Sequence, residues 1–145
     1  MNAIAERRAL LAQRSAGSVD ICMGRDGLRS LREDGSAKCR LPRNSRDAIL
    51  INTSGGLAGG DHITISAVVE KSAHLCLTTQ AAERVYRTVG PPAEISVSLT
   101  AHEHAVLFWV PQESILFNGS SLARRLSVNV SSTATLLGVE TMVFG

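Results

Sequence analysis

The residues best suited to metal chemistry are histidines with acidic or sulfur-bearing neighbours. His102 and His104 flank Glu103, and residues two apart on a strand share one face, where both imidazoles could bind one Ni²⁺ or Zn²⁺. A site of useful affinity generally needs three or four ligands, and no second cluster stands at a known spacing. The favoured interpretation is therefore a solvated turn, with His102 and His104 kept as weak metal candidates.

Two further pairs contain potential ligands. His62 follows Asp61 directly, and His74 precedes Cys76 by two residues on one strand face. Each of these residues is more often a plain surface or interior residue than a ligand. One functional hypothesis nevertheless combines the pair Asp61 and His62 with His102 and His104 into the metal site of an enzyme or sensor.

Catalytic patterns are missing from the sequence. There is no Gly-x-Ser-x-Gly nucleophile elbow, and the glycines have neither the P-loop nor the dinucleotide spacing. The acids that could form a carboxylate pair are too scattered to be paired: Asp61, Glu83, Glu113 and Glu140. The sequence therefore predicts a protein that is not an enzyme and that binds no cofactor tightly.

The chain is arranged around an apolar run, Ile49 to Ile51, that leads into two glycine pairs and Asp61. Glycine reaches positive φ without steric cost, so a doubled pair marks backbone that turns sharply or lies close to another chain. A tight turn between strands is the alternative. The candidate partner or passage residues in this segment are Gly55, Gly56, Gly59, Gly60 and Asp61.

Short alternating runs around this segment predict an all-β protein. Turn residues separate the runs at roughly ten-residue spacing, which is typical of a β-sandwich or of a stacked-sheet, β-helix-like solenoid with few short helices. Lys71 and Ser72 are expected to form a hairpin loop, and no sequence repeat identifies a solenoid family. The expected strands are Ser18 to Met23, Ala37 to Leu41, Ala48 to Thr53, His62 to Glu70, Ala73 to Thr79, Glu94 to Thr100, Ala105 to Val110, Ser114 to Phe117, Arg124 to Val130 and Ala134 to Phe144.

Composition limits the class of protein. Hydrophobic residues make up 44% and charged residues 19% of the 145 residues, as in ordinary globular domains. Aromatic residues are only 3%, which argues against a nucleic-acid surface built on base stacking. Three scattered cysteines fit reduced thiols, and no apolar run approaches the ~18 residues of a membrane span. We therefore expect a cytoplasmic protein that binds neither nucleic acid nor membrane.

The two ends of the chain carry separate expectations. Residues 1–14 are an N-terminal extension, helical or disordered, that precedes one β domain over residues 15–145. Ala134 to Phe144 is still an apolar strand when the sequence stops at Gly145. An apolar strand left at an edge is normally avoided, so this domain is expected to be incomplete at its C-terminus.

Three long motifs in register resemble the urease accessory protein family UreD, also called UreH. They are Gly55-Gly56-Leu57-Ala58-Gly59-Gly60-Asp61, Thr78-Thr79-Gln80-Ala81-Ala82-Glu83-Arg84-Val85-Tyr86-Arg87 and Trp109-Val110-Pro111-Gln112-Glu113-Ser114-Ile115-Leu116-Phe117. The resemblance covers about Ser15 to Gly145. It implies a mostly β protein of roughly twice this length that is not an enzyme. The family often has a glycine-containing turn at positions 101–104, where this chain has none.

The resemblance also implies a function. Proteins of this family bind urease apoprotein and, with UreF-type and UreG-type partners, place nickel in the urease active site. Nickel would be transient cargo that passes through the subunit. The matching candidates for passage or structural polar roles are Asp61, Thr78, Thr79, Gln80 and Glu140. For Asp61 two roles stay open, capping of the glycine turn or a place in the passage, and an inactive fragment is a third reading of the chain.

Overall fold

The computed structural model describes residues 14–145, and within this range the chain forms strands, turns and loops without a helix. The predicted all-β class is confirmed. The predicted N-terminal extension, residues 1–14, lies outside the described residues except for Arg14. Since residues 14–145 contain no helix, none of them belongs to a helix that could cross a membrane.

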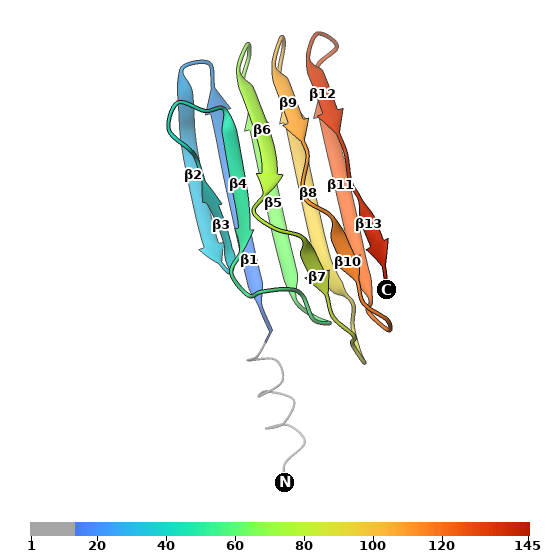
Figure 1. Cartoon of the computed structure of the whole chain (residues 1–145). Helices are drawn as coiled ribbons and strands as arrows, with labels where there is room; N and C mark the ends of the chain where they lie inside the picture. Colours follow the sequence, from blue (N-terminus) through green and yellow to red (C-terminus); the bar gives the residue numbers. More distant parts are fainter. Residues whose placement is uncertain (1–13) are drawn as a thin grey trace.

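Three consecutive coils form most of the fold, which is a stacked-sheet, solenoid-like architecture (Figure 1). Each coil contributes one strand to each of three sheets, and equivalent strands of successive coils pair in parallel. The coils are β5 (His62–Val69), β6 (His74–Thr79) and β7 (Glu83–Val85), then β8 (Ala93–Ala101), β9 (Val106–Trp109) and β10 (Ser114–Leu116), then β11 (Leu122–Val130), β12 (Thr135–Gly138) and β13 (Met142–Phe144).

The N-terminal part of the fold is antiparallel. It consists of β1 (Ala16–Gly24), β2 (Gly27–Gly35), β3 (Ala37–Arg40) and β4 (Asp47–Asn52). β1 and β4 continue the parallel sheets beside β5 and β6, whereas β2 and β3 pair antiparallel on their outer sides and form the edges. β2 carries Arg29, Arg32, Glu33 and Asp34, and charged side chains on an edge strand hinder further strand addition.

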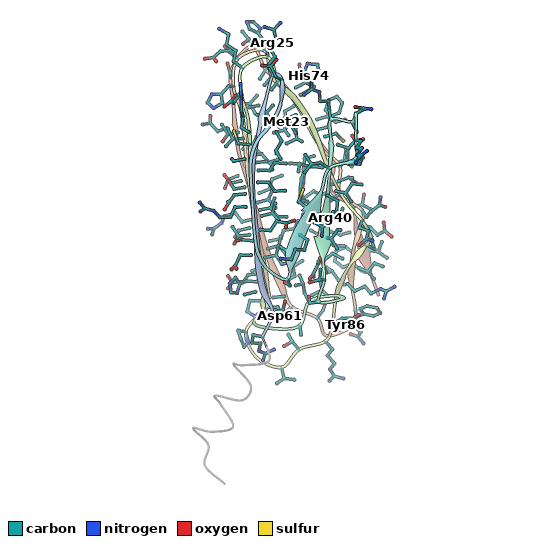
Figure 2. All side chains as sticks on the ribbon, turned by 90° about the vertical axis from the view of Figure 1, so that its left-hand side faces the viewer. Met23, Arg25, Arg40, Asp61, His74 and Tyr86 are labelled. Atoms are coloured by element: carbon teal, nitrogen blue, oxygen red, sulfur yellow. The ribbon has the colours of Figure 1, made fainter. Side chains whose placement is uncertain are left out.

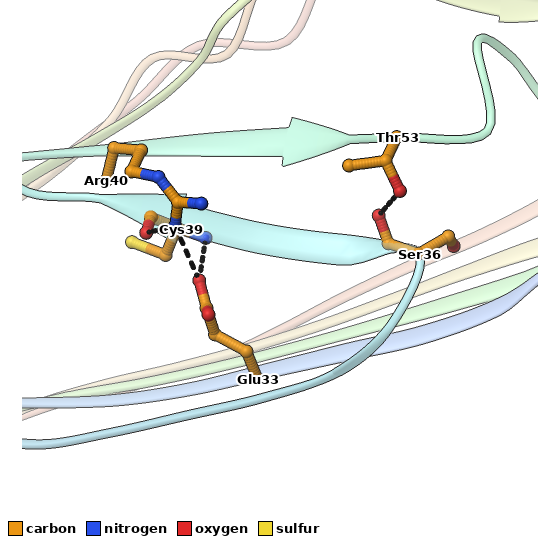
Figure 3. Close-up of polar contacts among 5 residues, drawn as sticks. All are labelled: Glu33, Ser36, Cys39, Arg40 and Thr53. Atoms are coloured by element: carbon orange, nitrogen blue, oxygen red, sulfur yellow. Dashed lines mark hydrogen bonds and ion pairs between the residues drawn. The ribbon is translucent and has the colours of Figure 1, made fainter.

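Glu33 ties these two edge strands together (Figure 3). Its carboxylate accepts hydrogen bonds from the backbone N–H of Cys39 in β3 and, at 3.2 Å, from the Arg40 guanidinium. An edge strand leaves backbone donors unpaired. Glu33 therefore satisfies one such donor and links the edges of the two five-stranded sheets.

The core lies between two layers of strands, and side chains fill the space between them (Figure 2). One layer is the sheet β11-β8-β5-β1-β2, and the other holds β12-β9-β6-β4-β3 with the small sheet β13-β10-β7. In register, Ile63 lies beside Ile95 and Ile65 beside Val97, and all four are buried. Alternate residues of each strand enter the core, so stacked coils place the apolar side chains in continuous rows.

Two local predictions are wrong. Lys71 and Ser72 do not close a hairpin, because β5 and β6 pair with different neighbours in different sheets. The expected strand at 134–144 is instead β12 and β13, two strands in different sheets. Alternation along the chain is the same for a hairpin and for a corner between layers, so it does not distinguish them.

Three equivalent turns reveal a structural repeat. The backbone N–H groups of Ala73, Ala105 and Ala134 donate to the carbonyls of Glu70, His102 and Ser131, each at 3.0 Å. Each turn joins the first strand of a coil to the second. The three turns share only a small residue at their last position, so the sequence alone does not reveal the repeat.

We expect the Cys39 thiol to be unreactive in the folded chain. Burial, with the Glu33 carboxylate nearby, raises the pKa of Cys39 from 9.0 to about 11, which lowers the thiolate fraction roughly 100-fold. In a variant with Cys22→Ser and Cys76→Ser, maleimide labelling should be slow in buffer and fast in urea. Equal rates in buffer and in urea would contradict this structure of β3.

Candidate functional site

A cavity of about 260 Å³ lies between the two layers, at the level where β4, β6 and β9 end and β7 and β10 begin. The wall formed by the first layer is apolar apart from Arg124 and includes Ile63, Ile65 and Ile95. The opposite wall follows the corner of each coil, where short polar segments replace the alternating strands. The volume is ample for ordered water, because a single water occupies ~30 Å³ of liquid.

Glu83 is the acidic group of this wall. Its Oε1 accepts a hydrogen bond from Asn52 Nδ2 at 3.1 Å, and Glu83 stands in register with Ser114 of the next coil. Burial raises the pKa of the Glu83 carboxyl, while the Asn52 hydrogen bond and the charge of Arg124 act in the opposite direction. The corner thus holds a carboxylate, an amide and a hydroxyl in one row along the coils.

Arg124 crosses the space between the layers. It enters from β11, and its Nη2 and Nε atoms donate to the two carboxylate oxygens of Glu140 at 2.7 and 3.0 Å. The same carboxylate accepts a hydrogen bond from Trp109 Nε1 at 2.8 Å. The Arg124 hydrogen bond is the main cause that lowers the pKa of Glu140. Glu140 therefore neutralises the only arginine that faces the cavity from the first layer.

The threonine motif lies at the same corner. Thr79 and Gln80 line the cavity, whereas Thr78 and Glu140 do not. Thr79 Oγ1 donates to the Ala81 carbonyl at 3.1 Å and accepts from the backbone N–H of Gln112 at 2.9 Å. Thr78 Oγ1 donates to the Val110 carbonyl at 2.9 Å. Both threonines therefore join neighbouring coils, and Gln80, which is exposed, is freer to interact with a ligand.

The glycine segment bends and lies close to other backbone, as its composition predicts. Gly56 has φ 143° and faces Tyr86 and the Arg84 carbonyl, which an added Cβ would approach to 2.9 Å. An added Cβ on Gly59 would lie 2.5 Å from the Pro91 carbonyl and would overlap Thr88. Gly55 and Gly56 line the cavity, whereas Gly59 and Gly60 do not.

Asp61 is buried and lies outside the cavity wall. Its Oδ1 accepts from the backbone N–H of Ser15 and its Oδ2 from that of Ala58, each at 2.8 Å. This is the geometry of turn capping. Capping is one of the two roles that the sequence leaves open for Asp61, and the other is a place in the passage. The Asp61 carboxylate also ties the start of β1 to the glycine turn.

The histidine candidates are not brought together. His102 and His104 lie in the exposed turn after β8 and not on a strand. Asp61 and His62 stand at the opposite end of the paired strands β5 and β8. Figure 2 shows this separation, because Asp61 is labelled at one end of the molecule and His74, which directly follows the turn after β5, is labelled at the other. Among residues 14–145 no three His, Cys, Asp or Glu residues could hold one metal ion. The combined metal site that the enzyme or sensor hypothesis needs is therefore contradicted.

His104 also explains how the chain manages without a glycine in this turn. It has φ 58°, a left-handed conformation in which histidine is among the better-tolerated residues other than glycine. Its backbone N–H donates to Thr133 Oγ1 of the next turn at 3.2 Å. The turn therefore adopts a left-handed backbone conformation without a glycine.

Sequence reasoning missed most of the cavity residues. Asn52, Arg124 and Gln112 belong to no chemical motif of the sequence, and Glu83 is one of several scattered acids. The spacing of the corners would have been the useful signal, because Glu83 and Ser114 occupy equivalent positions one coil apart. That signal is visible only after the coils have been aligned.

Comparison with known proteins gives a consistent result. The family profile of the UreD urease accessory protein matches residues 14–145. The urease accessory protein UreD of Mesorhizobium japonicum is 46% identical over 145 residues, which is 98% of this chain and 51% of the relative. The UreD proteins of Ruegeria pomeroyi and Brucella suis are 49% and 45% identical, over 79% and 88% of this chain and 46% and 47% of their own lengths. The chain thus spans about half the length of these curated relatives.

Glu83 should make the stability of the chain fall as pH rises. Because its pKa is raised on folding, the folded state holds the proton more tightly than the unfolded state between the two pKa values, and its contribution is lost above the folded pKa. Glu83→Gln should therefore raise the free energy of unfolding at neutral pH by on the order of 1 kcal/mol. Urea unfolding from about pH 5 to about pH 8 measures this, with the exposed Glu94→Gln as control. Equal pH slopes for wild type and Glu83→Gln would contradict it.

Substitutions of Asp61 should lower the free energy of unfolding, and by more when they remove more hydrogen-bond acceptors. Asp61→Ala removes two buried acceptors and should cost about 2 kcal/mol, whereas Asp61→Asn keeps one acceptor and should cost about half of that. Urea unfolding measures both, and Asp20→Ala, an exposed change in β1, serves as control. Wild-type stability in both Asp61 variants would show that the carboxylate does not act as a cap.

Proposed function

This chain belongs to the UreD family of urease accessory proteins, and from that premise we propose that it takes part in urease maturation and is not an enzyme. In this proposal it binds urease apoprotein and, with UreF-type and UreG-type partners, supports insertion of nickel into the urease active site. The observation that carries the proposal is the family match, which includes every residue from 14 to 145. The place of action would be the cytoplasm.

The cavity supports a role for this subunit in guiding nickel. Its corner wall carries the carboxylate of Glu83 and the side-chain amide of Gln80 in a space with room for water. Oxygen ligands and water hold divalent cations more loosely than a closed set of histidines or cysteines would. A wall of this kind suits a cargo that must leave again.

The charged residues that line the cavity are Lys38, Glu83, Arg84 and Arg124, of which Arg84 is exposed to solvent. A free arginine would repel a cation, but Glu140 accepts both hydrogen bonds of Arg124, so its charge is balanced. Glu83 receives an amide hydrogen bond and forms no ion pair among residues 14–145, and burial disfavours its charge. A divalent cation beside Glu83 would stabilise the carboxylate form. Glu83 is therefore the residue that we assign to contact nickel in transit.

Urease activation should depend on Glu83. In cells that express urease and the other accessory proteins without their own UreD, this chain should restore urease activity and the nickel content of purified urease. Glu83→Gln should lower both severalfold and leave capture of urease apoprotein unchanged, because the substitution keeps the shape and removes the charge.

The matched control is Glu94→Gln, which removes an exposed carboxylate on the outer face of β8. Activity with Glu94→Gln but not with Glu83→Gln supports the route. Full activation by both variants would exclude Glu83 from it. If wild-type chain neither captures urease apoprotein nor raises nickel content, the inactive-fragment interpretation holds instead.

A further inference from the structure

The cavity is lined by an asparagine, Asn52, that engages both polar atoms of its side chain. Its Oδ1 accepts a hydrogen bond from the backbone N–H of Ser54 at 3.0 Å, and the Ser54 hydroxyl lies 2.6 Å from the same oxygen. Its Nδ2 donates to Glu83 Oε1 at 3.1 Å and, more weakly, to the Gly56 carbonyl at 3.5 Å. The amide thus faces Ser54 with its oxygen and Glu83 with its nitrogen.

These contacts fix the orientation of the amide. The hydrogen bond from the Ser54 N–H to Oδ1 closes a short turn that asparagine commonly forms with the residue two positions further along. A flipped amide would point its own N–H groups at the Ser54 N–H and its oxygen at the Glu83 carboxylate. Donors would then face donors and acceptors would face acceptors, which leaves polar groups unsatisfied. Asn52 therefore presents only N–H groups to Glu83.

Asn52 is not a cation ligand in this orientation, because its oxygen is occupied and N–H groups do not bind cations. It acts instead on the carboxylate beside it. Oε1 of Glu83 accepts the hydrogen bond from Asn52, whereas Oε2 accepts no hydrogen bond from residues 14–145. Oε2 is therefore the one carboxylate oxygen of Glu83 that these residues leave available to a ligand.

We propose that Asn52 is a positioning residue that leaves a divalent cation only one oxygen of Glu83 and so keeps that cation releasable. The inference rests on the proposed contact between Glu83 and nickel in transit. Affinity for divalent cations rises with the number of charged oxygens and with bidentate carboxylate binding. Because the Asn52 amide occupies Oε1, a bidentate contact would first have to break a hydrogen bond. A cation held by one oxygen and by water leaves more readily than a cation in a closed site.

The missing charge of the amide matters as much as its position. An aspartate at position 52 would keep the shape of the side chain and place a second carboxylate where Nδ2 lies 3.1 Å from Glu83 Oε1. Two adjacent carboxylates repel each other, and a divalent cation between them relieves that repulsion. Asparagine at position 52 therefore suits transit, whereas aspartate would suit storage.

Titration of the purified chain with Ni²⁺, followed by calorimetry, tests the proposal. Asn52→Asp should bind Ni²⁺ roughly tenfold more tightly than wild type, because a second charged oxygen is added. The double variant Asn52→Asp with Glu83→Gln should lose this gain, since the pair needs both carboxylates. The matched control Asn129→Asp makes the same change on the exposed outer face of β11 and should bind like wild type. Equal affinity of Asn52→Asp and wild type, or a gain that survives in the double variant, would overturn the proposal.

A second variant decides the question if Asn52→Asp fails to fold by circular dichroism. Asn52→Ala removes the amide and frees Oε1, so its affinity for Ni²⁺ should rise severalfold above that of wild type. A merely structural role of Asn52 would instead loosen this corner of the chain and lower the affinity. An unchanged or lower affinity of Asn52→Ala would therefore contradict the proposal.

Experiments in cells separate this proposal from the role of Glu83. When urease and the other accessory proteins are co-expressed, Asn52→Asp should lower the nickel content of urease severalfold, and the variant chain itself should purify with nickel bound. Asn129→Asp should do neither. Lower activation without nickel retained on the Asn52→Asp chain would contradict trapping by the carboxylate pair. Full activation by Glu83→Gln would instead exclude the transit role itself, whatever the affinity of Asn52→Asp.

Discussion

The fold depends on one constraint, which is that each strand satisfies its backbone hydrogen bonds through the strand one coil away. β5 pairs with β1 on one side and β8 on the other, and β6 pairs likewise with β4 and β9. Sheets of parallel strands are stable mainly when both neighbours are present and the faces are covered. The apolar rows between the layers, from Val19 to Val97, follow from this stacking.

The cavity is a consequence of the same stacking. A coil must turn from one sheet to the next, and at that corner the alternation of apolar residues is interrupted. Because the coils are in register, Asn52, Glu83 and Ser114 meet there although they are distant in sequence. The family match concerns the whole chain, whereas the cavity is formed by the few positions that stacking brings together.

Sequence reasoning reached the all-β class, the family and most strand positions, because alternation and turn residues are local signals. It missed β2, in which charged residues hide a strand that forms an edge, and it joined β12 to β13 across a corner. For Asp61 it leaves open a cap of the glycine turn or a place in the passage, and in the structure the carboxylate accepts backbone hydrogen bonds from Ser15 and Ala58. Pairing between coils joins residues about thirty positions apart in the chain, and a single sequence carries no direct signal for such contacts.

The antiparallel strands at the N-terminal end have a consequence for the order of folding. β1 to β4 pair largely within residues 16–52, so they can form as soon as this segment leaves the ribosome. Each later coil then needs only to close a loop of about thirty residues onto an existing edge, and loop closure of that length costs little. Synthesis from the N-terminus would provide each edge strand before the strand that pairs with it. The coils would therefore fold one after another, starting from the N-terminal end.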